Sequence, residues 1–485
     1  MKITLFLAAA TSLLLAGCGE KSNPPAQTTN AAPANDRVKA TPPTALDRYV
    51  YAPDTNYQWQ VVNTFKQPGV TVHVLSLTSQ AWLTSKEVNK PIWKHYLTIA
   101  VPDKTTNTTG LLVISGGSNE KPAPDKADSA ITMIAMSANT VVANLNNIPS
   151  EPLIFPDRTN ALSEDGIIAY TWDKYLRTGD EKWPARLPMT KAAVRAMDTV
   201  TAFCASEAGG HRKVDKFFVT GASKRGWTTW TTAAVDSRVV GIAPIVIDVL
   251  NVEPALIAHY NSYGFFAPAV GSYTKEHIMD WLGTPECHRL MQIEDPYEYR
   301  ARLTLPKLII TAAGDQFFPT DSAQFYYNDL PGMKYLRTVP NTDHGIKGTE
   351  GWMSVLAFYY TLVNGTPLPQ FDWKHEAPGE VRITTRTEPI EVKLWEATNP
   401  DARDFRLETL GPVWKSSDVK IEKSGRYTVR VPKPAKGWTA YFVELKFNSN
   451  LMAPHVFTTD ARVVPDVRPY QWGKPKSPPT SSVGR

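Results

Sequence analysis

The chain contains few cysteines, with three among 485 residues, and this scarcity excludes a small fold held together mainly by disulfides. Cys18 lies in the amino-terminal segment, so only Cys204 and Cys287 remain for the rest of the chain. Two alternatives stay open for this pair, one disulfide or two separately buried thiols. The sequence alone does not show whether their Cα atoms come within bonding reach.

Two further absences narrow the function. The nine histidines are scattered, and no group of cysteine and histidine has the spacing of a zinc site, so we expect no metal and no cofactor. The net charge of +5 is spread along the chain without a block of lysine and arginine. Nucleic acid is therefore not an expected partner.

The first hydrophobic run, Ile3–Leu15, is too short to cross a bilayer but has the length of an export-signal core. It ends in Leu-Ala-Gly-Cys at Cys18, which resembles the lipobox of bacterial lipoproteins; an ordinary secretory signal is the alternative. We expect residues 1–17 to be a lipoprotein signal peptide and Cys18 to be lipidated. The protein is then exported and held to the cell envelope by this anchor. Gly19 at the next position favours the outer membrane.

The composition divides the rest of the chain. Residues 18–46 are rich in Pro, Ala, Thr and Asn, which predicts a disordered tether. Beyond residue 367, short alternating strands are separated by Pro, Asn and Gly, which predicts an Ig- or fibronectin-like β-sandwich over residues 368–463. Residues 464–485 form a Pro-rich tail, in which Tyr470 and Trp472 are candidates for docking onto the body.

Residues 47–367 alternate between strand and helix patterns. Strands are expected near residues 72–77, 95–101, 111–115, 140–145, 217–221, 239–249, 306–312 and 334–339, and helices near 190–205, 224–234, 321–328 and 351–364. This alternation predicts an α/β fold with a doubly wound, mostly parallel sheet that binds ligands at the carboxyl ends of its strands. Residues 251–302 are an aromatic-rich insertion, interpreted as a lid, with ordinary packing as the alternative.

The clearest motif is the segment 221–227, Gly-Ala-Ser-Lys-Arg-Gly-Trp, which follows the apolar run Phe217–Val219. A serine on a tight turn between a strand and a helix is the arrangement of a nucleophile elbow. Gly221 and Gly226 provide the small residues that such a turn requires, and Ser223 is the expected nucleophile. The spacing is Gly-x-Ser-x-x-Gly, one residue longer after the serine than usual.

A base and an acid follow in the chain order expected for this type of site. Asp315 comes directly after the strand that ends near residue 312, and His344 comes after the strand that ends near residue 339. We expect His344 to accept the proton of Ser223 and Asp315 to orient the imidazole. Asp248 is a reserve candidate for the acid, and Asp343 is a less favoured one.

An oxyanion hole requires two N–H groups close to the serine. The expected donors are the N–H of Lys224 and one N–H from the loop after an earlier buried strand, at Gly116 or Gly117. The alternative for the two glycines is a simple tight turn. We expect the side chains of Lys224 and Arg225 to be solvated, and Glu151 is a candidate for the pocket rim.

Three segments carry a family resemblance: 221–227, the run Gly-Asp-Gln-Phe-Phe at 314–318, and Asn-Thr-Asp-His at 341–344. Together they resemble the PhoPQ-activated pathogenicity-related proteins, a family that includes the autocrine proliferation repressors, over roughly Tyr49–Phe457. The resemblance implies an α/β-hydrolase-like fold with the serine, acid and histidine roles at Ser223, Asp315 and His344. The elbow is also similar to that of glucuronoyl esterases, and a β-domain beside a hydrolase unit is similar to secreted peptidases.

The sequence therefore predicts an exported serine hydrolase that acts by acyl transfer on a small-molecule ester or a peptide. A carboxylic ester is favoured because its leaving group is the less demanding one. A serine peptidase is one alternative. A non-catalytic surface lipoprotein that uses the hydrolase fold for binding is the other.

Overall fold

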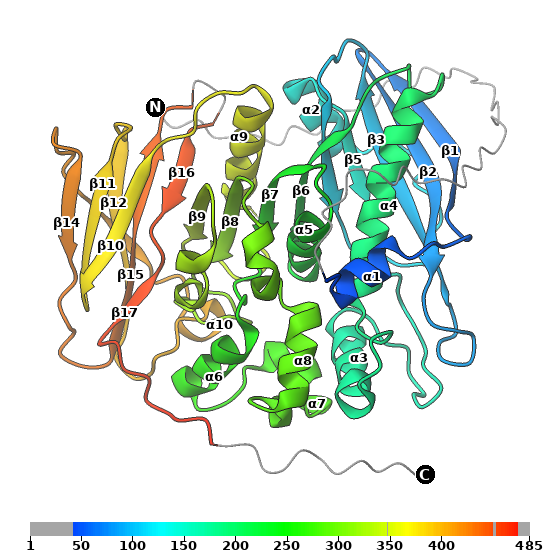
Figure 1. Ribbon diagram of the computed structural model, residues 1–485. Helices are drawn as coiled ribbons and strands as arrows, with labels where there is room; N and C mark the ends of the chain where they lie inside the picture. The colour runs from blue at the N-terminus through cyan, green and yellow to red at the C-terminus, as the bar shows by residue number, and fades with distance from the viewer. Residues whose placement is uncertain (1–41, 347, 450–452, 474–485) are drawn as a thin grey trace, which may run out of the picture.

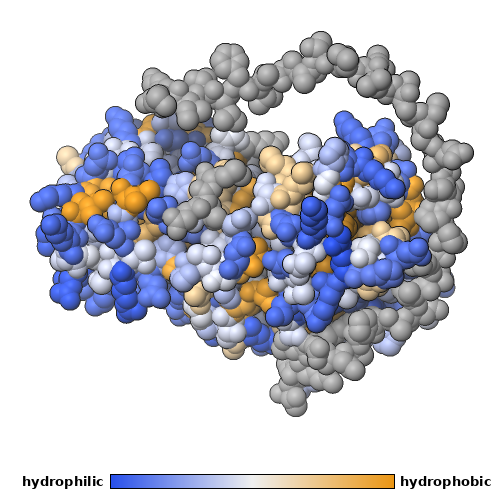
Figure 2. All heavy atoms as spheres, turned by 90° about the horizontal axis from the view of Figure 1, so that it is seen from above, coloured by the Kyte–Doolittle hydropathy of each residue, from blue (hydrophilic) through white to orange (hydrophobic). Residues whose placement is uncertain are grey.

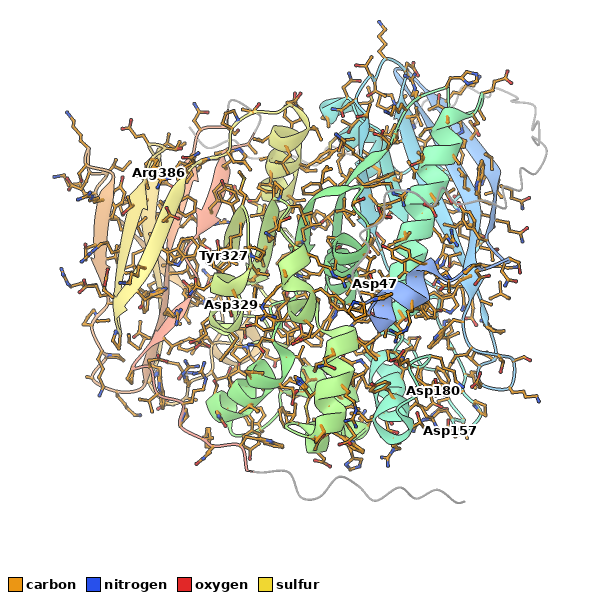
Figure 3. The ribbon with its side chains drawn as sticks, in the orientation of Figure 1. Asp47, Asp157, Asp180, Tyr327, Asp329 and Arg386 are labelled. Atoms are coloured by element: carbon orange, nitrogen blue, oxygen red, sulfur yellow. The ribbon has the colours of Figure 1, made fainter. Side chains whose placement is uncertain are left out.

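The computed structural model describes residues 42–346, 348–449 and 453–473. The expected signal peptide, Cys18 and most of the expected tether lie outside these residues. The first described helix is α1 (Ala45–Tyr51), which includes the last two residues of the expected tether. Thr44 and Asp47 form a capping box there, and Asp47 also accepts two hydrogen bonds from Arg302, so α1 is anchored to the body (Figure 3).

A sheet of fourteen strands runs through the described part of the molecule (Figure 1). In spatial order its strands are β1 (Gln58–Gln67), β2 (Val70–Ala81), β3 (Ile92–Pro102), β5 (Val142–Leu145), β4 (Thr109–Ile114), β6 (Lys216–Ala222), β7 (Val239–Ile245), β8 (Lys307–Ala312), β9 (Lys334–Val339), β16 (His455–Thr458), β15 (Trp438–Phe447), β12 (Glu391–Asn399) and β13 (Lys415–Asp418), with β17 (Arg462–Val464) beside β15. The strands from β5 to β9 are parallel, and β1, β2 and β3 pair antiparallel. The expected α/β fold with a mostly parallel central sheet is confirmed.

Helices cover both faces of this sheet. They are α2 (Ser129–Ala138), α3 (Asp165–Thr178), α4 (Arg186–Ala205), α5 (Lys224–Val235) and α9 (Gly351–Val363). Core residues of α3, α4 and α5 share one hydrophobic cluster with Phe217 and Val219 of β6. Those of α2 and α9 share the other cluster with Phe218. Because successive side chains of a strand point to opposite faces, the two clusters fill the two sides of the sheet.

The expected insertion consists of short helices at one end of the sheet, which is the lower end in Figure 1. They are α6 (Val252–Tyr263), η1 (Pro268–Val270), α7 (Gly271–Lys275), η2 (Ile278–Trp281), α8 (Pro285–Glu294) and η3 (Pro296–Arg302). The helix expected near residues 321–328 is instead two short 3₁₀ turns, η4 (Ser322–Phe325) and η5 (Tyr327–Asp329). The strands β6, β7, β8 and β9 are parallel, so the loops that follow them lie at the same edge of the sheet. The short helices of the insertion lie next to this edge.

The carboxyl-terminal strands do not form the separate β-sandwich that was expected, so that prediction is not confirmed. Strand β16 pairs with β9 at Thr458 and Leu336, so β12, β13, β15, β16 and β17 extend the large sheet. A second sheet of β10 (Phe371–Ala377), β11 (Glu380–Thr385) and β14 (Arg426–Arg430) packs against them, with Val381 and Val443 in the same cluster. The alternating pattern of these segments specified strands, but not the strand with which each one pairs.

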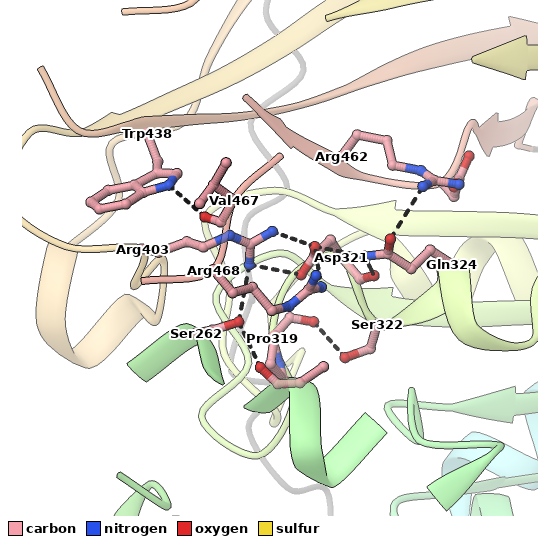
Figure 4. A network of polar contacts seen from close by, with 12 residues as sticks. Ser262, Pro319, Asp321, Ser322, Gln324, Arg403, Trp438, Arg462, Val467 and Arg468 are labelled. Atoms are coloured by element: carbon pink, nitrogen blue, oxygen red, sulfur yellow. Dashed lines mark hydrogen bonds and ion pairs between the residues drawn. The ribbon is translucent and has the colours of Figure 1, made fainter. Parts of the chain in front are cut away.

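A buried ion cluster joins this extension to the loop after β8 (Figure 4). Arg403, which precedes α10 (Leu407–Leu410), donates from Nη2 to Oδ2 of Asp321 at 2.6 Å and from Nη1 to Ser262 of α6 at 3.1 Å. Arg468 of the tail donates to the same Asp321 oxygen at 3.0 Å. One carboxylate thus connects the body, the extension and the tail.

The described part of the tail is docked. Trp472 packs edge-on against Tyr260 and Phe266, with ring centroids 4.8 and 5.1 Å away, and the N–H of Tyr470 donates to the carbonyl of Asn261. The expected docking of Trp472 is therefore confirmed. The ring of Tyr470 stays half-exposed, and it packs against Gly264 at the end of α6, where a Cβ atom would lie 2.9 Å from the ring.

Cys204 and Cys287 are buried free thiols, so the disulfide alternative is wrong and the two-thiol alternative holds. Within residues 42–346, 348–449 and 453–473, no helix is long and apolar enough to cross a membrane. On the face shown in Figure 2, hydrophobic residues are mixed with hydrophilic ones. Exposed methionines of α2 lie at the end of the molecule away from α6, α7 and α8 (Figure 1).

Candidate active site

Ser223 is the single residue between the end of β6 and the start of α5. Its backbone has φ 58° and ψ −127°, a conformation that is strained for a residue with a side chain and is typical of functional turns. Its N–H donates to the carbonyl of Ile245 on the neighbouring strand at 2.8 Å. The serine is therefore held in the strained turn by the sheet.

The two glycines of the motif allow this turn to close. A Cβ atom on Gly221 would lie 2.8 Å from the carbonyl oxygen of Arg225, and one on Gly226 would lie 3.0 Å from the carbonyl oxygens of Gly221 and Ile245. Both contacts are with backbone, which has little room to move. Gly226, the second glycine, packs against the ends of β6 and β7. This position explains why the spacing after the serine is Ser-x-x-Gly.

Asp315 and His344 come together as the sequence predicts. Asp315 follows β8, His344 follows β9, and Nδ1 of His344 lies 2.8 Å from Oδ2 of the buried Asp315. The N–H of Phe317 donates to the other carboxylate oxygen at 2.8 Å, and the Phe317 ring lies 4.4 Å from the imidazole. This arrangement orients the imidazole with Nε2 pointing away from the acid.

Nε2 of His344 is buried and has no hydrogen-bond partner among the described residues. No hydrogen bond joins it to Ser223 in this structure. Serine–histidine hydrogen bonds are often long or poorly aligned without substrate and tighten on binding. The acid–base half of the site is assembled, and the nucleophile stands at the same sheet edge, after β6, with β7 between β6 and β8.

Asp248 and Asp343, the other candidate acids, are used elsewhere. Asp248 accepts a hydrogen bond of 2.6 Å from Tyr326, and burial raises the pKa of its carboxyl to about 8, with the charge of Asp315 adding to the shift. Asp343 accepts a hydrogen bond from the N–H of Gly345. Among the three acids, the structure places Asp315 on the histidine.

Gly116 and Gly117 lie in the loop after β4, close to the elbow helix. A Cβ atom on Gly116 would lie 2.5 Å from Nη2 of Arg225, and one on Gly117, whose φ is 154°, would lie 3.2 Å from the N atom of Asn147. A side chain at Gly116 would therefore require the guanidinium of Arg225 to shift. An oxyanion role for these N–H groups stays a prediction, as it does for Lys224, whose N–H belongs to the first turn of α5 and so has no intrahelical partner.

The expected solvation of the Lys224 and Arg225 side chains is wrong, because both are buried in ion pairs. Lys224 lies 2.5 Å from Glu164, and Arg225 donates two hydrogen bonds to the same carboxylate, at 2.6 and 2.9 Å. Burial of Glu164 acts in the opposite direction, but these two cations lower the pKa of its carboxyl. Nothing in the local sequence links Glu164, which lies 59 positions before Ser223 in the numbering, to the elbow.

Glu151 is buried behind this cluster and does not line the cavity at Ser223. Its Oε2 accepts the N–H of Glu164 at 2.6 Å, and Oε1 lies 3.7 Å from Arg225. Burial raises the pKa of Glu151 to about 7, and the charge of Glu164 adds to the shift. Glu151, a candidate for the pocket rim, therefore does not lie there.

This raised pKa predicts a dependence of stability on pH. The pKa of Glu151 rises from 4.5 to about 7 on folding, so its contribution to stability is present below the lower value and is lost as the pH rises through the higher one. Glu151→Gln keeps an acceptor oxygen but does not titrate. We expect the free energy of unfolding of this variant, relative to wild type, to increase between about pH 5 and about pH 8. Urea unfolding at both pH values measures it, with the exposed Glu207→Gln as control. An equal difference at the two pH values contradicts the assignment.

A cavity of about 50 Å³ opens beside Ser223. Its walls are mainly apolar and aromatic and come from α3 to α7 and from the loops after β7 and β8. They comprise Asp165, Trp172, Arg186, Ser223, Lys224, Trp227, Ile247, Val249, Val252, Leu256, Val270, Tyr273, Phe317 and Phe318. The insertion contributes four of these residues, and Tyr273 is the one among its aromatic side chains that lines the cavity. Trp172 and Arg186 were not singled out in the sequence, because both lie outside the helices that the sequence predicts.

A larger cavity of about 320 Å³ lies elsewhere, between the segment around η5 and the three-stranded sheet. Tyr327 and Arg386, both labelled in Figure 3, belong to its lining. None of the residues Ser223, Asp315 and His344 does. The smaller cavity is therefore the candidate active site, because it is the one of the two that Ser223 lines.

The site has a strained serine between a strand and a helix, at the carboxyl edge of a mostly parallel sheet. An acid–histidine pair follows it in the chain. These features together define the α/β-hydrolase class of fold. Residues 46–406 match the family described as PhoPQ-activated pathogenicity-related protein, and the chain belongs to this family. Autocrine proliferation repressor protein A of Dictyostelium discoideum is a relative. It is 35% identical over 456 residues, which cover 88% of this chain and 92% of that protein.

Several solved structures are similar at low identity. Acetyl xylan esterase 1 from Thermoanaerobacterium sp. is 14% identical with a TM-score of 0.43, over 66% of this chain and 91% of the esterase chain. Acylaminoacyl peptidase from Pyrococcus horikoshii is 15% identical with a TM-score of 0.39, over 65% of this chain and 49% of the peptidase chain. Glucuronoyl esterase from Solibacter usitatus is 13% identical with a TM-score of 0.35, over 65% and 90%.

Proposed function

We propose that the protein is a serine hydrolase that cleaves carboxylic esters by acyl transfer. The observation that carries the proposal is the 2.8 Å contact between Asp315 and Nδ1 of His344, which leaves a buried Nε2 without a partner among the described residues. Ser223 stands in a strained turn at the same edge of the sheet. An imidazole oriented in this way is suited to take a proton from a hydroxyl group.

In this mechanism Ser223 attacks the ester carbonyl while Nε2 of His344 accepts the hydroxyl proton, and Asp315 stabilises the resulting imidazolium. N–H groups of Lys224 and of the Gly116–Gly117 loop would hold the oxyanion of the tetrahedral intermediate. His344 then returns the proton to the leaving alcohol. Water, activated by the same imidazole, releases the acyl group and regenerates the serine.

Covalent labelling with a fluorophosphonate probe tests the proposal. We expect wild-type protein to be labelled, Ser223→Ala to give no label and His344→Ala to be labelled far more slowly, because the probe reacts only with an activated serine. Ser424→Ala, at an exposed position away from the cavity, is the matched control and should label like wild type. A folded wild-type protein that takes no label would sink the enzyme proposal and favour a binding role.

Export and lipid anchoring at Cys18 are a further part of the proposal. They are supported by the apolar run Ile3–Leu15 and by the Leu-Ala-Gly-Cys ending. The hydrolase body would then stand at the cell envelope, where its substrates are small esters or peptides that reach that compartment.

A further inference from the structure

Arg186 is a buried cation in the wall of the cavity that holds Ser223. It is the first residue of α4 and is 3% exposed. Its guanidinium carbon lies 3.7 Å from the ring centroid of Trp227 and 5.9 Å from that of Trp172. Two tryptophans of the cavity wall thus hold the guanidinium in place.

The protein leaves part of this guanidinium unused. Nε of Arg186 lies 2.8 Å from Oε2 of Glu294, which is also buried. Nε and Nη1 are both buried and make no hydrogen bond with the described residues, so the contact with Glu294 is an ion pair only. A buried donor on a charged group is costly when it stays unpaired, so a group that accepts its hydrogen bond is bound strongly.

The other charged residues of the cavity wall are satisfied. Oδ1 of Asp165 accepts a hydrogen bond of 3.2 Å from Tyr273, and its Oδ2 lies 3.3 Å from Nζ of Lys224. Lys224 in turn lies 2.5 Å from Glu164. The charges of Asp165 and Lys224 therefore offset each other, and Arg186 is the lining cation that has a buried donor to spare.

We propose that Arg186 binds a carboxylate on the acyl part of the substrate, so that the enzyme prefers esters of short dicarboxylic acids. The inference rests on the proposed function and names its substrate class. A cavity of about 50 Å³ holds only a few heavy atoms, which suits a short methylene chain that ends in a planar anion. The leaving group has to reach solvent, so we assign the group seated against the aromatic wall of this small, partly open cavity to the acyl part.

Two esters of equal chain length test the preference. Mono-4-nitrophenyl glutarate carries a terminal carboxylate where 4-nitrophenyl pentanoate carries a methyl group. We expect wild type to show a kcat/KM about 10-fold to 100-fold higher for the glutarate ester, as a hydrogen-bonded charge pair suggests. Arg186→Met should remove this preference, and Arg186→Lys, which keeps the charge but not the planar fork, should restore part of it.

Arg195→Met is the matched control. Arg195 lies on the same helix, is buried, pairs with Asp198 at 3.1 Å and covers the Tyr57 ring at 4.7 Å, but it does not line the cavity. Its replacement disturbs α4 to a similar degree and should leave the ratio of the two kcat/KM values unchanged. Thermal unfolding of both variants identifies a loss that is due to misfolding.

Two results overturn the inference: a wild-type enzyme that hydrolyses the two esters equally or prefers the neutral one, or an Arg186→Met variant that is folded and keeps the wild-type ratio. If neither ester is turned over but the fluorophosphonate labels Ser223, a protection experiment replaces the rate ratio. It compares how well monomethyl glutarate and methyl pentanoate slow the labelling of Ser223, and equal protection by the two esters overturns the inference. If neither turnover nor labelling occurs, the proposed function itself fails.

Discussion

Asp315→Asn is expected to lower kcat for ester hydrolysis by about ten-thousand-fold while the protein stays folded. The amide has nearly the shape of the carboxylate, so the 2.8 Å contact with Nδ1 of His344 can be kept. An amide nitrogen facing Nδ1, however, favours the imidazole tautomer that carries its proton on Nε2. That tautomer cannot accept the proton of Ser223, and the imidazolium loses its stabilising charge.

Asp248→Asn provides the control for this prediction. Asp248 lies after the neighbouring strand, and it is bonded to Tyr326 instead of His344. Because the pKa of Asp248 is raised to about 8 by burial, this carboxyl is mainly protonated at neutral pH, and an amide replaces it with little change of charge. We expect kcat to fall by less than about tenfold. Steady-state rates and near-ultraviolet circular dichroism measure the two variants. If Asp248→Asn has the larger effect, the acid has been assigned to the wrong strand.

Arg403→Met is expected to lower the free energy of unfolding by about 3 kcal/mol, because it leaves the buried carboxylate of Asp321 with the partly exposed Arg468 as its remaining cationic partner among the described residues. The side chains of Arg403 and Asp321 are both only 1% exposed. Although burial acts in the other direction, the charge of Arg403 lowers the pKa of Asp321. The midpoint of urea unfolding at neutral pH measures this loss.

Arg468→Met is the graded comparison. Its side chain is 20% exposed and its nitrogen lies 3.0 Å from Asp321, so solvent screens the pair and we expect a loss of about 1 kcal/mol or less. The double change Arg403→Met with Asp321→Leu removes both buried charges and should recover much of the stability. If Arg403→Met is no less stable than Arg468→Met, the buried cluster does not hold the loop after β8 in the way that we infer.

The parts of the site that depend on chain order could be predicted from the sequence. Ser223 and Asp315 each follow an apolar run that predicts a buried strand, and His344 follows the strand expected at 334–339. Parallel strands bring their carboxyl ends to the same edge. The glycines at 221 and 226 are equally local signals, because a Cβ at either position meets backbone.

The parts that depend on pairing between distant segments could not be predicted. Glu164 meets Lys224 and Arg225 only because α3 begins next to the elbow, and Arg186 reaches the cavity because α4 starts beneath Trp227. In the sequence, Glu164 and Arg186 look like surface residues because they are charged. Strand β7 also ends at Ile245, before the expected residue 249, since Val246 has a φ of 45° that breaks the strand.

The docked tail implies an order in which the parts of the molecule can fold. Arg403 and Arg468, which hold Asp321 six positions after the proposed catalytic acid, are made after every strand from β1 to β12. A chain that emerges from its amino end can pair its parallel strands early, but it cannot complete this loop until its final segment has arrived. A chain that lacks residue 468 would therefore hold Asp321 through Arg403 and Gln324 alone, without the contact that the tail provides.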